Sequence, residues 1–133
     1  MAIQVNYIDG GVGVEILFSG FVSGTDILRY RGDLYTPERL DKQRYQLIDR
    51  SQCQKYFVSN GDIKRIAEID AQAAAIKPGI VIAIVSPSEM LQRAAEIWKS
   101  YLDKAGFVVA LFDDRNAAIA WIESRLGAKI PLD

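Results

Sequence analysis

Two unbroken apolar segments place the strongest constraint on what this chain can fold into. Residues 80–85 read IVIAIV and residues 107–112 read FVVALF. Neither segment alternates apolar with polar residues, and both are rich in β-branched or aromatic side chains. This composition is typical of a strand that is covered on both faces, as in sheets with helices on either side. The two segments therefore predict an α/β domain with a largely parallel sheet.

The remaining segments predict where the other elements lie. Residues 3–20 have the pattern of a β-hairpin whose Gly-rich turn contains Gly10 and Gly11. The segments that follow are a short helix within 22–35, a polar connection over 36–44, a third strand over 45–51, a short link through Cys53 and a strand that leads into a helix across 56–70. Two further helices are predicted at about 87–103 and 115–126, the second ended by Gly127.

This order predicts the fold class and the domain organisation. An N-terminal β-hairpin is followed by βαβαβα units, which gives a mixed, mostly parallel five-stranded sheet with about four helices. A chain of 133 residues has the length of one domain. We therefore expect a single domain over residues 1–133, with a short C-terminal tail over 127–133.

Composition excludes several classes of function. The formal net charge is −1, which gives no overall attraction to nucleic acid or to an anionic membrane. No apolar run approaches the roughly 20 residues that cross a bilayer, and the first residues lack the pattern of a signal peptide. We expect a cytoplasmic protein that neither spans a membrane nor binds nucleic acid.

The absence of histidine narrows the possible chemistry further. Without histidine the chain lacks the usual zinc sites, the Ser-His-Asp and Cys-His arrangements and the commonest general base near neutral pH. The single cysteine, Cys53, cannot form an internal disulfide and is interpreted as a small buried hydrophobe. We expect no catalytic role, no metal site and no cofactor.

Three predicted helices begin with a serine that precedes an acid by three residues, which is the spacing of a capping box. The pairs are Ser23 with Asp26, Ser59 with Asp62, and Ser86 with Glu89, the last with Pro87 at the first helical position. Asp113 and Asp114 are predicted to cap the helix that follows them. Ser59 is thus interpreted as a helix cap, with a regulatory role as the alternative.

Two stretches resemble a known family. YQLIDRSQCQKYFVSNGDI, residues 45–63, is similar to the segment of STAS domains in which a strand leads through a short loop to a helix N-terminus. FDDRNAAIAWIESRL, residues 112–126, is similar to the closing strand and helix of stand-alone bacterial proteins of the related anti-sigma-factor-antagonist-like superfamily. The resemblance implies a STAS-like fold and a regulatory role. It also makes Ser59 a candidate phosphoacceptor, with Asn60, Gly61 and Asp62 as a candidate interaction surface.

One carboxylate is placed where local rules do not explain it. At 100° per residue, Asp70 falls on the apolar face of its predicted helix, and Arg31 falls on the apolar face of the helix within 22–35. An unpaired buried carboxylate is costly, so we predict a buried ion pair between Arg31 and Asp70. The alternatives are that the side chains extend to solvent or to a dimer partner, or that Asp70 is a functional acid.

Two functions agree with these observations. The first is a non-catalytic regulatory module, homodimeric and bound to a protein partner through the surface around Ser59. The second is a binding module for a small apolar molecule or lipid, because the alanine-rich helix that contains Asp70 could leave a cleft beside its neighbours. Trp98 and Trp121 are interpreted as core residues.

Overall fold

A five-stranded sheet forms the centre of the computed structural model, which describes residues 2–102 and 105–132. The strands lie in chain order: β1 (Ile3–Ile8), β2 (Gly13–Ser23), β3 (Tyr45–Phe57), β4 (Val81–Val85) and β5 (Val108–Phe112). β1 and β2 pair antiparallel as a hairpin, and all other neighbours pair parallel. The predicted α/β class with a hairpin and a mostly parallel sheet is confirmed.

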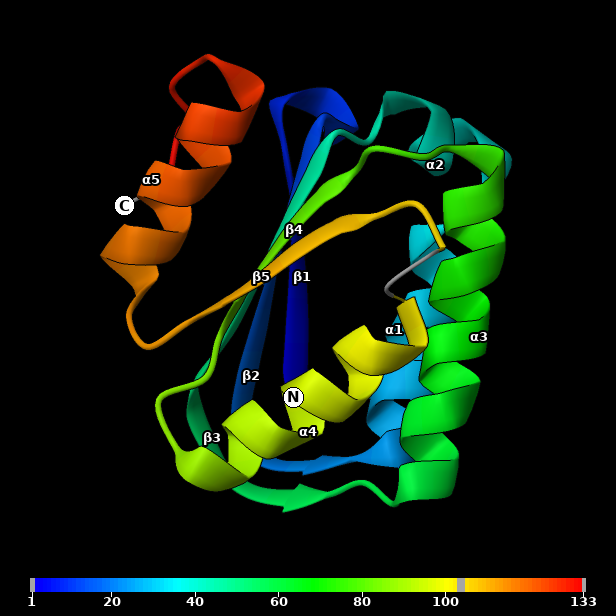
Figure 1. The fold of residues 1–133 in the computed structure, drawn as a ribbon, viewed down its shortest axis with the longest axis vertical. Coiled ribbons are helices and arrows are strands. Elements are labelled where there is room, and N and C mark those ends of the chain that lie inside the picture. Colours follow the sequence, from blue (N-terminus) through cyan, green and yellow to red (C-terminus); the bar gives the residue numbers. More distant parts are fainter. Residues whose placement is uncertain (1, 103–104, 133) are drawn as a thin grey trace.

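The described helices cover the two faces of the sheet unequally. They are the 3-10 turn η1 (Asp9–Gly11) and α1 (Gly24–Leu34), α2 (Pro37–Lys42), α3 (Asn60–Ile76), α4 (Glu89–Leu102) and α5 (Arg115–Leu126). Figure 1 shows α1, α3 and α4 on one side of the sheet and α5 on the other. Successive right-handed crossovers between neighbouring parallel strands place their helices on the same face. α5 follows the last strand and covers the opposite face.

Each face of the sheet has its own core. Val14, Ile16, Ile48, Ile82 and Ile84 belong to the core beneath α1, α3 and α4. The second core, beneath α5, contains Tyr45, Leu47, Val81, Ala83 and Val85. Every residue of β4 is buried, as the apolar run predicts. The same prediction is wrong for β5, whose five residues are only half-buried because β5 is an edge strand.

β2 and β3 extend well beyond the other strands. The pairing of β2 with β3 continues to Ser23 and Phe57, with extra residues in β3 between Leu17 and Ser19 and between Gly20 and Phe21 of β2. Such bulges bend a strand, and Gly20 adds a φ of 62°. In Figure 1 the extension runs sideways below the rest of the sheet, past the ends of α1, α3 and α4.

Two segments that were expected to be loops, the link through Cys53 and the connection over 36–44, belong to a strand and a helix in the structure. The third strand does not end at residue 51, because the link through Cys53 is part of β3, and Cys53 is half-buried rather than buried. The polar connection over 36–44 contains α2, with Thr36 before it and Pro37 at its start. The Thr-Pro-Glu sequence is a helix start signal that could have identified α2.

The helix ends follow the predicted chemistry in most places. Ser23 and Ser59 both form complete capping boxes, with Asp26 and Asp62 respectively. Asp114 accepts a hydrogen bond from Ala117 N at 3.1 Å, and Gly127 ends α5 in the left-handed conformation at φ 70°. No described helix has both the length and the apolar composition of a membrane span.

The predicted cap at Ser86 is wrong. Ser86 N donates to Phe112 O at 2.9 Å, which continues the pairing of β4 with β5 and delays the helix to Glu89. Ser88 Oγ instead accepts from Leu91 N at 3.2 Å. α4 therefore covers residues 89–102 of the predicted 87–103, and residue 103 lies outside the described residues.

Candidate functional site

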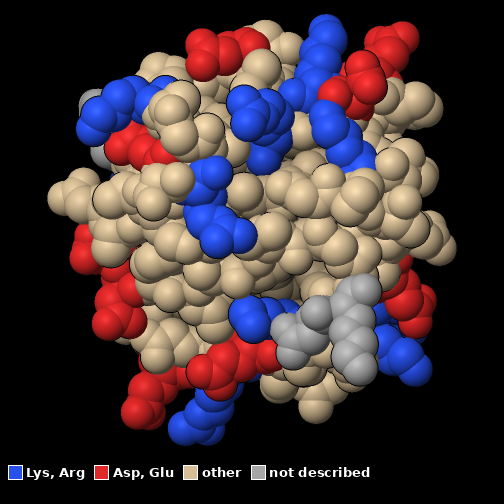
Figure 2. All heavy atoms as spheres, turned by 45° about the horizontal axis from the view of Figure 1, so that its top comes forward, with Lys and Arg blue, Asp and Glu red and all other residues tan. Residues whose placement is uncertain are grey.

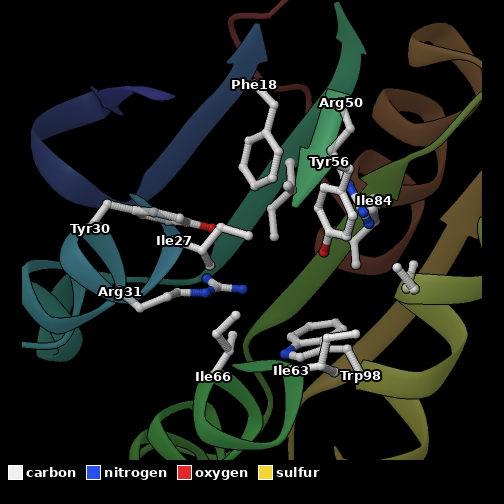
Figure 3. A pocket seen from close by; sticks show the side chains of 13 residues that line it. Phe18, Ile27, Tyr30, Arg31, Arg50, Tyr56, Ile63, Ile66, Ile84 and Trp98 are labelled. Carbon is white, nitrogen blue, oxygen red and sulfur yellow. The ribbon is translucent and has the colours of Figure 1, made fainter. Parts of the chain in front are cut away.

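A small cavity lies between the sheet and the three helices on its first face. Its volume is about 40 Å³, room for roughly three water-sized atoms. Thirteen side chains line it, and Figure 3 shows them converging from the strands and from α1, α3 and α4. Most are apolar, but Arg31 from α1 and Arg50 from β3 bring two guanidinium groups to the same space.

Arg31 is balanced by Asp70, which is fully buried on α3. Arg31 Nε lies 3.4 Å from Asp70 Oδ1, so the structure brings together the two residues of the predicted ion pair. Arg31 Nη1 also donates to Gln46 Oε1 at 2.8 Å. Burial is the largest effect and works against the charge of Arg31, but the Asp70 carboxylate and the neighbouring tyrosines together outweigh it and raise the pKa of Arg31.

Two further donors complete the surroundings of Asp70. Tyr35 donates its hydroxyl to Asp70 Oδ1 at 2.6 Å, and the Trp98 indole N–H donates to Oδ2 at 2.7 Å. Burial nevertheless raises the pKa of Asp70, although the cation and both donors favour its ionised form. Because both carboxylate oxygens already accept hydrogen bonds, Asp70 acts here as a buried junction between α1, α3 and α4.

Sequence reasoning missed the polar role of Trp98. We expected a core residue, and its ring is buried, but its N–H is directed at a carboxylate on another helix. A buried tryptophan usually finds a partner for its N–H. That general rule was the only sequence signal, since the partner is 28 residues away in the chain.

Arg50 differs from Arg31 because it has no counter-ion. It lies at the first bulge of β3 and is only 4% exposed. Among the described residues, its Nε and Nη2 have no hydrogen-bond partner, and its guanidinium forms no ion pair. Its guanidinium carbon lies 4.7 Å from the centre of the Tyr56 ring and 5.7 Å from that of Phe18. Burial lowers the pKa of Arg50. Neither composition nor motif singled out this residue.

An outer groove adjoins the cavity. It lies between the start of α3 and the first half of α4 and has a volume of about 370 Å³. Its lining includes the apolar side chains Val58, Met90 and Ile97 and the polar side chains Asn60, Glu89 and Arg93. Tyr56, Ile63 and Ala94 line both the groove and the cavity. The two spaces are therefore neighbours that these three side chains border.

The predicted interaction surface lies beside this groove. Ser59, Asn60 and Gly61 are exposed, Asp62 is half-buried, and Asn60 lines the groove. Ser59 Oγ accepts from Asp62 N at 3.1 Å, so in this structure Ser59 caps α3. The phosphoacceptor role of Ser59 stays a prediction.

A separate polar network occupies the α5 face. Arg115 pairs with Glu15 and, at 3.1 Å, with Asp49, whose other oxygen accepts from Ser51 Oγ at 2.6 Å. Partial burial opposes the charge of Arg115, but the hydrogen bonds to the two carboxylates prevail and raise its pKa. The negative charge of Asp49 is therefore balanced by Arg115. Asp49 lies on the α5 face of the sheet, opposite the face that Asp70 packs against.

Exposed charge does not mark a binding face in the view of Figure 2. Acidic and basic side chains are mixed there, with uncharged surface between them. The charged group with the unusual position is instead the buried guanidinium of Arg50.

Comparison with known proteins does not identify this site, since no family model, curated protein or solved structure matches the chain. The STAS-like resemblance and the homodimer stay predictions.

Proposed function

We propose that this protein is a non-catalytic binding module for a small, mainly apolar molecule. The observation that carries the proposal is the pair of neighbouring spaces beside the sheet, which share Tyr56, Ile63 and Ala94 as lining residues. The outer groove, at about 370 Å³, falls within the range of roughly 300–1,000 Å³ that is typical of small-molecule sites. The inner cavity would receive one end of the ligand and the groove the rest.

The shared lining residue Ala94 allows a direct test. Ala94→Phe adds a ring at a position that lines both the groove and the cavity, whereas Ala120→Phe adds the same ring at an exposed position of α5. Native mass spectrometry of freshly purified protein should reveal a co-purifying apolar molecule. Calorimetric titration with 1-octanol should detect binding to the wild type and to Ala120→Phe, and at least tenfold weaker binding to Ala94→Phe. Failure of the wild type to bind any apolar molecule in either measurement would contradict the proposal.

A second candidate is a regulatory protein interaction at the N-terminal end of α3. It is supported by two aromatic side chains, Phe21 and Phe57, that are each 62% exposed and contact one another edge to face close to Ser59. A phosphate on Ser59 would add negative charge at a helix N-terminus, but it would also disrupt the capping box with Asp62. Such a modification would remodel this end of the molecule.

Intact-mass measurement of protein from the native host tests this second candidate. A gain of one phosphate on Ser59, together with a changed partner set for Ser59→Asp in a pull-down, would support it. Unmodified Ser59 and an unchanged partner set would refute the switch.

A further inference from the structure

The unbalanced charge of Arg50 indicates what kind of ligand the site accepts. Removal of a guanidinium from water without a counter-ion costs several kcal/mol, and cation–π contacts return only part of that cost. Arg31, in the same cavity, has Asp70 and Gln46 as partners, whereas within residues 2–102 and 105–132 Arg50 has only the faces of Phe18 and Tyr56. A protein retains such a local conflict most often where it serves a function.

The two unpartnered atoms are arranged for one type of group. Nε and Nη2 of an arginine lie on the same edge of the planar guanidinium, and this edge matches the two oxygens of a carboxylate. Neither atom is accessible to a water molecule, so the cavity that Arg50 lines does not reach this edge directly. A carboxylate in the cavity would contact the edge once the Arg50 side chain turns toward it. In Figure 3 its guanidinium lies beside the Tyr56 ring at the edge of the cavity.

Size and charge favour a single carboxylate. A cavity of about 40 Å³ holds roughly three water-sized atoms, which is the number of heavy atoms in a carboxylate. A phosphate is larger and carries up to two charges, whereas of the two guanidinium groups that line the cavity only that of Arg50 lacks a counter-ion among the described residues, since Asp70 balances Arg31. Tyr56, Ile63 and Ala94, which line both spaces, suit an apolar body behind such a head group.

We propose that the ligand is an apolar monocarboxylic acid whose carboxylate binds Arg50 in the inner cavity and whose apolar body lies in the outer groove. This inference rests on the proposed function and specifies its ligand class. Arg50 is then the binding residue that supplies the positive charge, and the ion pair with Asp70 keeps Arg31 from competing for the ligand's carboxylate.

Calorimetric titration with octanoate, 1-octanol and octyl phosphate tests this inference. Wild-type protein should bind octanoate at least tenfold more tightly than 1-octanol, since hydrogen bonds to charged groups have about that effect or more. Octyl phosphate should bind more weakly than octanoate. Arg50→Met should lose at least tenfold in octanoate affinity and keep its affinity for 1-octanol. Arg125→Met, which removes an exposed arginine of α5 that lines neither space, should keep both affinities.

The outcomes separate the inference from the proposed function. Equal affinities of the wild type for octanoate and 1-octanol overturn the carboxylate inference and leave an apolar binding module intact. Binding of neither compound overturns both. Octyl phosphate as the tightest ligand overturns the choice of a carboxylate. If Arg50→Met does not fold, the comparison of the two compounds on wild-type protein decides by itself.

Discussion

The two buried arginines should respond to the same substitution with opposite changes in stability. Arg50→Met removes a guanidinium that is 4% exposed, lacks partners at Nε and Nη2 and has no counter-ion among the described residues. The relieved desolvation amounts to several kcal/mol, and about 1–2 kcal/mol is lost with each desolvated cation–π contact. We expect the ligand-free protein to gain about 1–3 kcal/mol in free energy of unfolding.

Arg31→Met is the matched control, because it removes the same group from the other side of the cavity. Asp70 would keep Tyr35 and Trp98 as donors but lose its cation, and the loss of one partner of a buried pair typically costs about 3–5 kcal/mol. The further change Asp70→Asn should recover part of that loss, since it removes the stranded charge.

Urea unfolding at pH 7, followed by tryptophan fluorescence, measures these changes as shifts of the midpoint at constant slope. A loss of more than about 1 kcal/mol in Arg50→Met would refute the reasoning, because it would mean that Arg50 is favourably placed without a ligand. Similar losses in Arg50→Met and Arg31→Met would lead to the same conclusion.

Three further predictions concern packing and pH. Trp98→Phe should destabilise the protein by about 1–3 kcal/mol in urea unfolding, because Asp70 loses an N–H donor in a buried site. Gly13→Ala should lower the thermal midpoint, since a Cβ there would lie 2.1 Å from Cζ of the Tyr45 ring; an unchanged midpoint would contradict this packing. Burial raises the pKa of Tyr45 from 10 to about 12, so the unfolded state ionises first and wild-type stability should fall, by up to about 2 kcal/mol from this residue, between pH 10 and 12. Tyr45→Phe should flatten that fall in unfolding measured across this pH range, and an unchanged slope would refute the assignment.

Local rules predicted the elements whose signals lie within a few residues. The buried run of β4, the hairpin turn and the capping boxes at Ser23 and Ser59 depend on composition or short spacing, so they could be read directly. Ser86 shows the limit of that approach. Its spacing to Glu89 fits a cap, but a hydrogen bond to β5 keeps it in the sheet, and that bond depends on a strand more than twenty residues later.

In the candidate site, too, some features had a local sequence signal and others depended on distant segments. The apolar placement of Arg31 and Asp70 on two helices was visible from periodicity, and their proximity follows from helices that lie on the same face of the sheet. Arg50 was overlooked, because its burial depends on a bulge in β3 and on rings from two strands. The residue before it, Asp49, and the residue after it, Ser51, gave no sign that Arg50 would face the helices.

The sequence by itself determined an α/β chain with a hairpin, a buried central strand and helices with defined starts, because these features depend on side-chain period and on chemistry within one turn. Only the tertiary structure decided that Trp98 donates to Asp70, that β2 and β3 bend past the helix ends and that Arg50 is buried without an acidic partner in the described part of the chain. The physical reason is that desolvation and pairing of a charge depend on which distant segments surround it.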